Sequence, residues 1–114
     1  MLTVSNMRGA SGREVANQFI IENDCGTVTF QSYNSVIVTI VKPCNGELGI
    51  VSIGEDWDSS RTTAKYRCAF MREQGFNELA SKRGIERTLE GGYVVSDSGE
   101  VYRIAIQEGT RKYS

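Results

Sequence analysis

The hydrophobic and polar positions in the first half of the chain predict β-strands. From Asn17 onwards, four segments are rich in β-branched and aromatic residues, and short turn-like segments separate them. The four segments are NQFIIE, TVTFQSY, VIVTIVK and LGIVSIG. VIVTIVK is almost continuously β-branched, which is typical of a central strand that is covered on both faces. We therefore expect up to four antiparallel strands joined by short hairpins.

After Glu55 the hydrophobic residues take the spacing of a helix. We expect a helix that begins within two residues of Ser59, ends near Gln74 and stops at Gly75. Its N-cap accepts hydrogen bonds from the first free N–H groups of the helix, which a short polar side chain can do. The candidates for this cap are Asp58, Ser59 and Ser60. The helix dipole favours negative charge here, which explains the acidic residues at positions 55–58 without a metal site.

A second helical pattern covers residues 77–91, and Gly84 within it predicts either one helix or two short pieces. The segments YVVS and EVYRIAIQ follow, with the turn residues DSG between them, and they predict a C-terminal β-hairpin. The whole sequence therefore predicts an α+β fold in a single domain, residues 1–114. Its order is an antiparallel β-meander, then one or two helices, then the hairpin.

Composition narrows the chemistry. Of the 114 residues, 39% are hydrophobic and 24% are charged, as in globular domains. The chain contains no histidine, which excludes Ser-His-Asp and Cys-His mechanisms. It contains neither a G-x-G-x-x-G nor a G-x-x-x-x-G-K-[ST] phosphate loop. We expect a protein that is not an enzyme and that uses no cofactor.

The three cysteines have no C-x-x-C spacing and predict reduced thiols rather than a disulfide framework or a metal site. No apolar run approaches the roughly 18 residues that cross a bilayer. The N-terminal segment lacks the apolar core of a signal peptide. The expected location is therefore the cytoplasm, with no membrane partner.

The predicted helix has two different sides when its residues are placed at about 100° intervals. The apolar side carries Ala64, Tyr66, Cys68, Phe70 and Met71. Thr63 and Arg67 lie on the same side, so we expect both to face the core. Because an unpaired buried charge is costly, Arg67 should be at least half buried and paired with a carboxylate or with backbone carbonyls. The opposite side carries three cations, Arg61, Lys65 and Arg72, which we call the basic row.

Charge is divided along the chain. Residues 1–58 contain three Lys/Arg and seven Asp/Glu, whereas residues 59–114 contain ten and seven. Such a polarised molecule steers an oppositely charged partner. The basic row is therefore a candidate binding surface, and three aromatic residues that could stack on bases join it as candidates: Tyr33, Trp57 and Tyr66. The pI of about 5.5 differs from that of strongly basic duplex-DNA binders.

Three segments carry a resemblance to known proteins: GREVANQFII, FQSYNSVIV and WDSSRTTAKYRCAF. Together they resemble small proteins of phages, prophages and other bacterial mobile elements. In those proteins an N-Q-F strand leads to an F-Q-S-Y strand and then to a W-D-x-S-R-T-T-x-K-Y-R helix start. The resemblance covers about residues 12–72, with a looser match in IERTLEGGYVVSD. The corresponding residues are Asn17, Gln18, Phe19, Phe30, Gln31, Ser32, Tyr33, Trp57, Asp58, Ser60, Arg61, Thr62, Thr63, Lys65 and Tyr66.

The resemblance implies a phage or mobile-element origin and a bacterial cytoplasm, and it carries no assigned activity. We therefore expect an accessory protein that binds a host protein or a host defence complex, in the manner of an inhibitor. The alternative is a nucleic-acid-binding protein that uses the basic row. The acidic first half is a second candidate surface, suited to a basic groove. The sequence leaves open the partner, the host and the oligomeric state, including a homo-oligomer.

Overall fold

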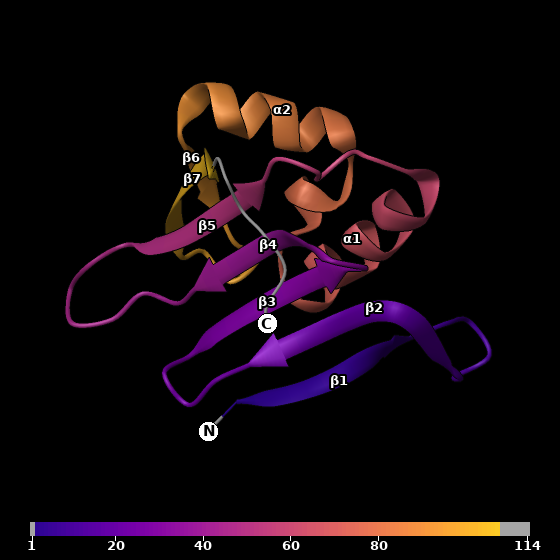
Figure 1. The fold of residues 1–114 in the computed structure, drawn as a ribbon. Coiled ribbons are helices and arrows are strands. Elements are labelled where there is room, and N and C mark those ends of the chain that lie inside the picture. Colours follow the sequence, from indigo (N-terminus) through magenta and orange to yellow (C-terminus); the bar gives the residue numbers. More distant parts are fainter. Residues whose placement is uncertain (1, 108–114) are drawn as a thin grey trace.

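The computed structural model of the chain describes residues 2–107 (Figure 1). Its elements, in chain order, are β1 (Thr3–Arg8), β2 (Glu14–Glu22), β3 (Thr27–Ser32), β4 (Ser35–Val41), β5 (Gly49–Gly54), α1 (Arg61–Glu73), the 3-10 helix η1 (Asn77–Ala80), α2 (Lys82–Gly91), β6 (Tyr93–Val95) and β7 (Val101–Gln107). Strands precede helices, and a strand pair follows them. The predicted α+β order is therefore confirmed.

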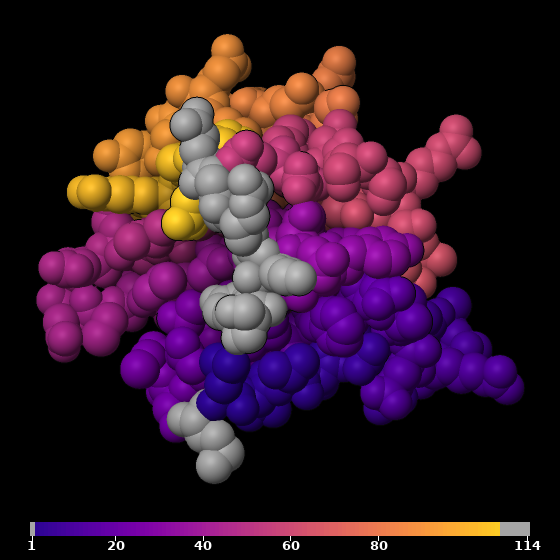
Figure 2. Space-filling view, in the orientation of Figure 1, coloured from indigo at the N-terminus to yellow at the C-terminus, as the bar shows by residue number. Residues whose placement is uncertain are grey.

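The seven strands form one sheet in the order β1-β2-β3-β4-β5-β7-β6. Every neighbouring pair is antiparallel except β5 and β7, which are parallel. The predicted antiparallel meander and C-terminal hairpin are confirmed, and the parallel pairing of β5 with β7, which the sequence did not predict, joins them into one sheet. Figure 2 shows the yellow atoms of β7 beside the magenta atoms of β5, although more than 40 residues separate the two strands along the chain. A parallel pair needs a long crossover connection, which the helices provide here.

β1 is a strand that the sequence pattern did not predict, because we expected the first strand to begin at Asn17. Its sequence TVSNMR is mostly polar and exposed, so it lacks the apolar alternation of a buried strand. It pairs with β2 and has a register shift between Asn6 and Arg8. Only Met7, at this irregularity, is buried in the core. The strand therefore owes its conformation to hydrogen bonding with β2 rather than to local propensity.

Both helices pack on one face of the sheet. Phe30 of β3 stacks on Phe70 of α1 with ring centroids 5.6 Å apart. Phe76, which follows α1, contacts Tyr102 of β7 edge-on, with ring centroids 4.8 Å apart. The other buried residues of this core are Met7, Val28, Ile37, Val38, Ile40, Val51, Ile53, Met71, Leu79, Ile85, Val94 and Ile104. β4 lies centrally between β3 and β5, as VIVTIVK predicts, although only part of its second face is covered.

The predicted start and end of α1 are confirmed. Its N-cap is Ser60, whose Oγ accepts a hydrogen bond from the backbone N–H of Thr63 at 3.1 Å. Gly75 has φ = 84°, a left-handed conformation that glycine adopts without strain and that ends the helix. The first turn contains no acidic residue. Two of the preceding carboxylates make specific side-chain contacts instead, which are described below.

The second helical segment forms two pieces, but the break lies at Ser81 rather than at Gly84. Ser81 caps α2 by accepting from the N–H of Gly84 at 3.0 Å. Gly84 lies inside α2, where an added Cβ would stand 1.8 Å from the carbonyl oxygen of Glu78. Glycine is therefore required by the close approach of α2 to η1, not by a break in the helix.

Gly84→Ala should destabilise the fold, although alanine normally favours a helix. The new methyl group would collide with backbone, so we expect a loss of about 1–3 kcal/mol in the free energy of unfolding, measured by urea denaturation. Gly91→Ala is the matched control, because a Cβ at Gly91 meets nothing within 4 Å. This control should be neutral or stabilising by up to about 1 kcal/mol. Equal effects of the two substitutions would contradict the packing explanation.

Candidate functional site

The three motif segments meet at one end of the sheet, although they are far apart in sequence. The hydroxyl groups of Ser32 in β3 and Thr63 in α1 are hydrogen-bonded at 2.9 Å. The backbone N–H of Tyr33 donates to the carbonyl of Asn17 at 2.7 Å. Ser35 donates to a carboxylate oxygen of Asp56 at 2.7 Å. We call this region, where β2, the β3–β4 turn and the start of α1 meet, the motif end.

The interior of the motif end is organised by Arg67. This side chain is 3% exposed, and its Nη1 donates to the carbonyl oxygen of Trp57. The guanidinium carbon lies 5.0 Å from the centre of the Trp57 ring, in a cation–π contact. Nη1 also lies 3.7 Å from Asp58 Oδ1. The prediction that Arg67 is buried and paired with a carbonyl or carboxylate is therefore confirmed.

Asp58 links the two helices. One carboxylate oxygen faces Arg67 of α1, and the other lies 2.7 Å from Nζ of Lys82 at the start of α2. The hydrogen bond from Lys82, with the positive charges of Lys82 and Arg67, holds the pKa of Asp58 below its ordinary value. The same bond raises the pKa of Lys82. Burial lowers the pKa of Arg67, and the charge of Asp58 opposes that shift. Asp58 is thus a structural carboxylate.

Gln18 is a buried polar residue that sequence reasoning did not identify. It is fully buried, and it faces Ser32 in the register of β2 and β3. Neither polar atom of its side chain has a hydrogen-bond partner among the described residues, and the same holds for Nε of Arg67. An unsatisfied buried polar group costs about 1–3 kcal/mol. The only sequence signal for Gln18 was its place in the N-Q-F motif.

The basic row lies on the solvent side of α1. Arg61, Lys65 and Arg72 are all exposed, whereas Thr63 and Arg67 are buried on the opposite side. The predicted phase of the helix is therefore confirmed. The row extends over about 16 Å along the helix axis, since Arg72 lies eleven positions after Arg61 and each position adds about 1.5 Å. The ammonium of Lys65 lies 5.3 Å from the centre of the Tyr66 ring, and Arg72 is in the last turn.

The three candidate aromatic residues have different environments. Trp57 is partly buried, packs against the core and contacts Arg67. Tyr66 is also partly buried against the core. Tyr33 is 52% exposed in the turn between β3 and β4. The structure therefore brings Tyr33 to the surface of the motif end and holds the other two rings against the protein.

Because the chain has no histidine, cysteine and carboxylate side chains are its candidate metal ligands. Cys25 and Cys44 are exposed, Cys68 is partly exposed, and all three are free thiols. Among residues 2–107 there is no group of three His, Cys, Asp or Glu side chains that could hold a metal ion. Over the same range, no helix has the length and apolar character needed to cross a membrane.

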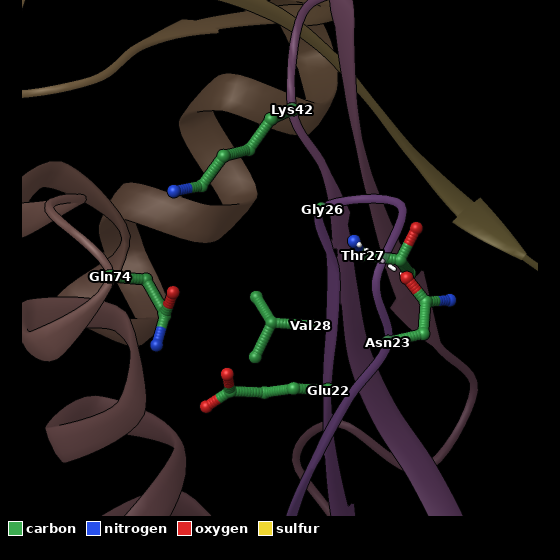
Figure 3. Close-up of a pocket in the computed structure, with 7 residues that line it drawn as sticks. All are labelled: Glu22, Asn23, Gly26, Thr27, Val28, Lys42 and Gln74. Carbon is green, nitrogen blue, oxygen red and sulfur yellow. Dashed lines mark hydrogen bonds between the residues drawn. The ribbon is translucent and has the colours of Figure 1, made fainter. Parts of the chain in front are cut away.

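The pocket in Figure 3 is small. It has a volume of about 130 Å³ and is lined by Glu22, Asn23, Gly26, Thr27, Val28, Lys42 and Gln74. The polar ends of Lys42, Glu22 and Gln74 extend into the space over Val28 (Figure 3). Sites for drug-sized ligands have about 300–1,000 Å³. A second depression, of about 370 Å³, is lined by Gly46, Glu47, Leu48, Ile50 and Arg103.

Arg67→Ala should strongly destabilise the protein. The substitution removes a buried side chain that contacts both Trp57 and Asp58, so we expect a loss of about 3 kcal/mol in the free energy of unfolding. Arg61→Ala, on the exposed side of the same helix, should change it by less than about 0.5 kcal/mol. Urea denaturation monitored by Trp57 fluorescence would measure both. A loss below about 1 kcal/mol for Arg67→Ala would contradict the central role of this guanidinium.

Asp58→Asn should reduce the dependence of stability on pH. Because the folded-state pKa of Asp58 lies below the unfolded value of about 3.9, the charged carboxylate stabilises the fold above that pH. This stabilisation is lost as the pH falls through the folded-state pKa. The difference in melting temperature between wild type and Asp58→Asn should therefore be largest near pH 6 and shrink below about pH 3. The difference in melting temperature between wild type and Lys82→Met should follow the same trend. A difference that does not change with pH would contradict the prediction.

Comparisons with known proteins give one match. No curated protein and no solved structure matches the chain. A family of unknown function, DUF8033, matches residues 3–87, which is 85 of the 114 residues. The matched range extends from β1 into α2 and includes the whole motif end. The chain therefore belongs to the DUF8033 family of unknown function.

Proposed function

We propose that this protein is a non-catalytic binding protein, and that its basic row docks on an acidic surface of a macromolecular partner. The observation that carries the proposal is the orientation of α1. Thr63, Arg67 and the core residues on its inner side fix the rotation of the helix, so the three cations of the basic row face solvent together. The helix fixes the backbone positions of the three cations, so only their side chains have to be ordered on binding.

The distribution of charge around α1 supports an anionic partner. The helical segment, residues 59–92, contains seven Lys/Arg and four Asp/Glu. Residues 1–58, which include strands β1 to β5, contain three Lys/Arg and seven Asp/Glu. The helical layer and the strand layer therefore carry opposite net charge. Complementary charge steers encounter and fixes orientation, so an acidic surface would approach the helical side.

A host protein or a host defence complex in the bacterial cytoplasm is the partner class that we propose. The resemblance of the motif segments to small phage and mobile-element proteins supports this setting. The meeting of those segments at the motif end supports a shared surface there. Within this proposal the protein acts as an inhibitor, which blocks the partner by occupying its surface and performs no turnover.

Nucleic acid is the alternative anionic partner. Binding of single strands combines cations with aromatic rings on which bases stack. Of the three candidate rings, Trp57 and Tyr66 are held against the core, and Tyr33 alone is well exposed. This arrangement offers fewer stacking platforms than the sequence suggested. We therefore favour an acidic protein surface.

Reversal of the basic row should abolish capture of the partner. We would immobilise wild type and the triple variant Arg61→Glu, Lys65→Glu, Arg72→Glu, and expose each to a nuclease-treated bacterial lysate. A protein retained stoichiometrically by wild type should be lost from the triple variant. Retention by wild type should weaken at high salt, because exposed charges are screened over about 8 Å at physiological ionic strength.

The matched control reverses three exposed cations outside the helical layer, Arg8, Arg13 and Arg103, and should retain the partner. Equal retention by the triple variant would contradict the proposal and favour the acidic first half, docked in a basic groove. Loss of all retention on nuclease treatment, with salt-dependent binding of single-stranded oligonucleotides, would favour the nucleic-acid alternative. Turnover of a small-molecule substrate that is lost on mutation of one carboxylate would refute both.

A further inference from the structure

Tyr33 has a backbone conformation that tyrosine rarely adopts. Its φ is 54°, and with Asn34 it forms the two-residue connection between β3 and β4. Positive φ is strained for a bulky residue because Cβ crowds the backbone, and glycine, asparagine or aspartate is the usual choice. The next turn of the chain follows this preference, since Asn45 and Gly46 occupy its positive-φ positions at 51° and 80°. Turn geometry therefore does not account for a tyrosine at position 33.

Hydrogen bonds on both sides hold the strained residue in place. The N–H of Tyr33 donates to the carbonyl of Asn17 at 2.7 Å. Its own carbonyl accepts from Nε2 of Gln31 at 2.9 Å. Asn17 also has a positive φ, of 64°, which asparagine tolerates. Strained conformations of this kind persist where the surroundings over-determine them, and they cluster at functional sites.

The fold makes little use of the Tyr33 ring. The side chain is 52% exposed and lies outside the hydrophobic core. Among residues 2–107 it has no stacking partner, no cation–π partner and no hydrogen bond to its hydroxyl. The strain at this residue is therefore not balanced by a ring contact or a side-chain hydrogen bond among the described residues.

Tyr33 lies at the same end of the molecule as the start of α1. The preceding residue, Ser32, is hydrogen-bonded to Thr63 in the first turn of α1, the turn that contains Arg61. Figure 1 shows the end of β3 beside α1. Exposed tyrosine and exposed arginine are both residue types that are enriched in binding hot spots.

We propose that Tyr33 is the anchor of the interface: its ring inserts into an apolar pocket on a protein partner, and the basic row binds the acidic surface around that pocket. This inference rests on the proposed function and adds the shape and chemistry of the partner's site. It assigns the strain at Tyr33 to presentation of the ring on a backbone that the hydrogen bonds with Asn17 and Gln31 hold in place.

The test uses Tyr33→Asn and Tyr33→Phe. Asparagine tolerates positive φ, so Tyr33→Asn should raise the melting temperature by on the order of 3 °C while it removes the ring. Tyr33→Phe keeps the ring and should leave the melting temperature unchanged. The probe for binding is the protein that wild type retains from nuclease-treated lysate, identified by mass spectrometry, purified and titrated calorimetrically. Tyr33→Asn should weaken its affinity about tenfold or more, and Tyr33→Phe by less than about threefold.

A reciprocal substitution supplies the control. Asn45→Tyr places a tyrosine at the equivalent φ in another turn, so it should lower the melting temperature and leave affinity unchanged. The loss of affinity in Tyr33→Asn should persist at high salt, because salt does not screen the burial of an aromatic ring. The loss in the charge-reversal variant should not persist, because salt screens exposed charges.

Four results would overturn the inference. A lower melting temperature for Tyr33→Asn would show that the ring serves the fold. Wild-type affinity for Tyr33→Asn, with binding still lost on reversal of the basic row, would remove the anchor and leave the proposed function intact. Binding of the oligonucleotide dT15 that Tyr33→Asn abolishes would make the ring a base-stacking platform instead. Failure of wild type to retain any protein would overturn both proposals.

Discussion

The guanidinium group of Arg67 is the interaction on which the helical layer depends. It lies under α1 and joins that helix to the preceding loop through the carbonyl and ring of Trp57. Asp58 extends the connection to Lys82, and therefore to the start of α2. A buried charge tolerates few alternative partners, so this network allows α1 a single rotation about its axis. The outward direction of Arg61, Lys65 and Arg72 follows from that rotation.

What the sequence could predict is what depends on local periodicity. The limits of α1 follow from the Ser60 cap and the Gly75 stop, and the burial of Thr63 and Arg67 follows from their helical phase. The four central strands are recognisable because their β-branched residues form long runs. Strand pairings between segments that are distant in sequence could not be predicted. β1 is a strand because β2 pairs with it, and β7 joins β5 because the helices carry the chain across the sheet.

Within the candidate site, too, some features could be predicted from local periodicity and others depend on distant contacts. The basic row could be predicted, since exposure on one side of a helix follows from burial on the other. The environments of Trp57, Tyr66 and Tyr33 could not, because they depend on which segment packs over each ring. The pattern at Gly84 left one helix or two short pieces open, because the sequence does not show that the Glu78 carbonyl lies against this residue. Gln18 was missed because nothing in its local pattern indicates burial.

The parallel pairing of β5 with β7 has a consequence for synthesis on the ribosome. β5 ends at Gly54, but the strand that hydrogen-bonds to its free edge ends at Gln107. At 5–20 residues per second, translation of the 53 intervening residues takes about 3–10 s. During that time the edge of β5, with the hydrophobic Val51 and Ile53, is open to pairing with other chains. In a nascent chain of this fold the edge of β5 therefore stays unpaired until β7 has been synthesised.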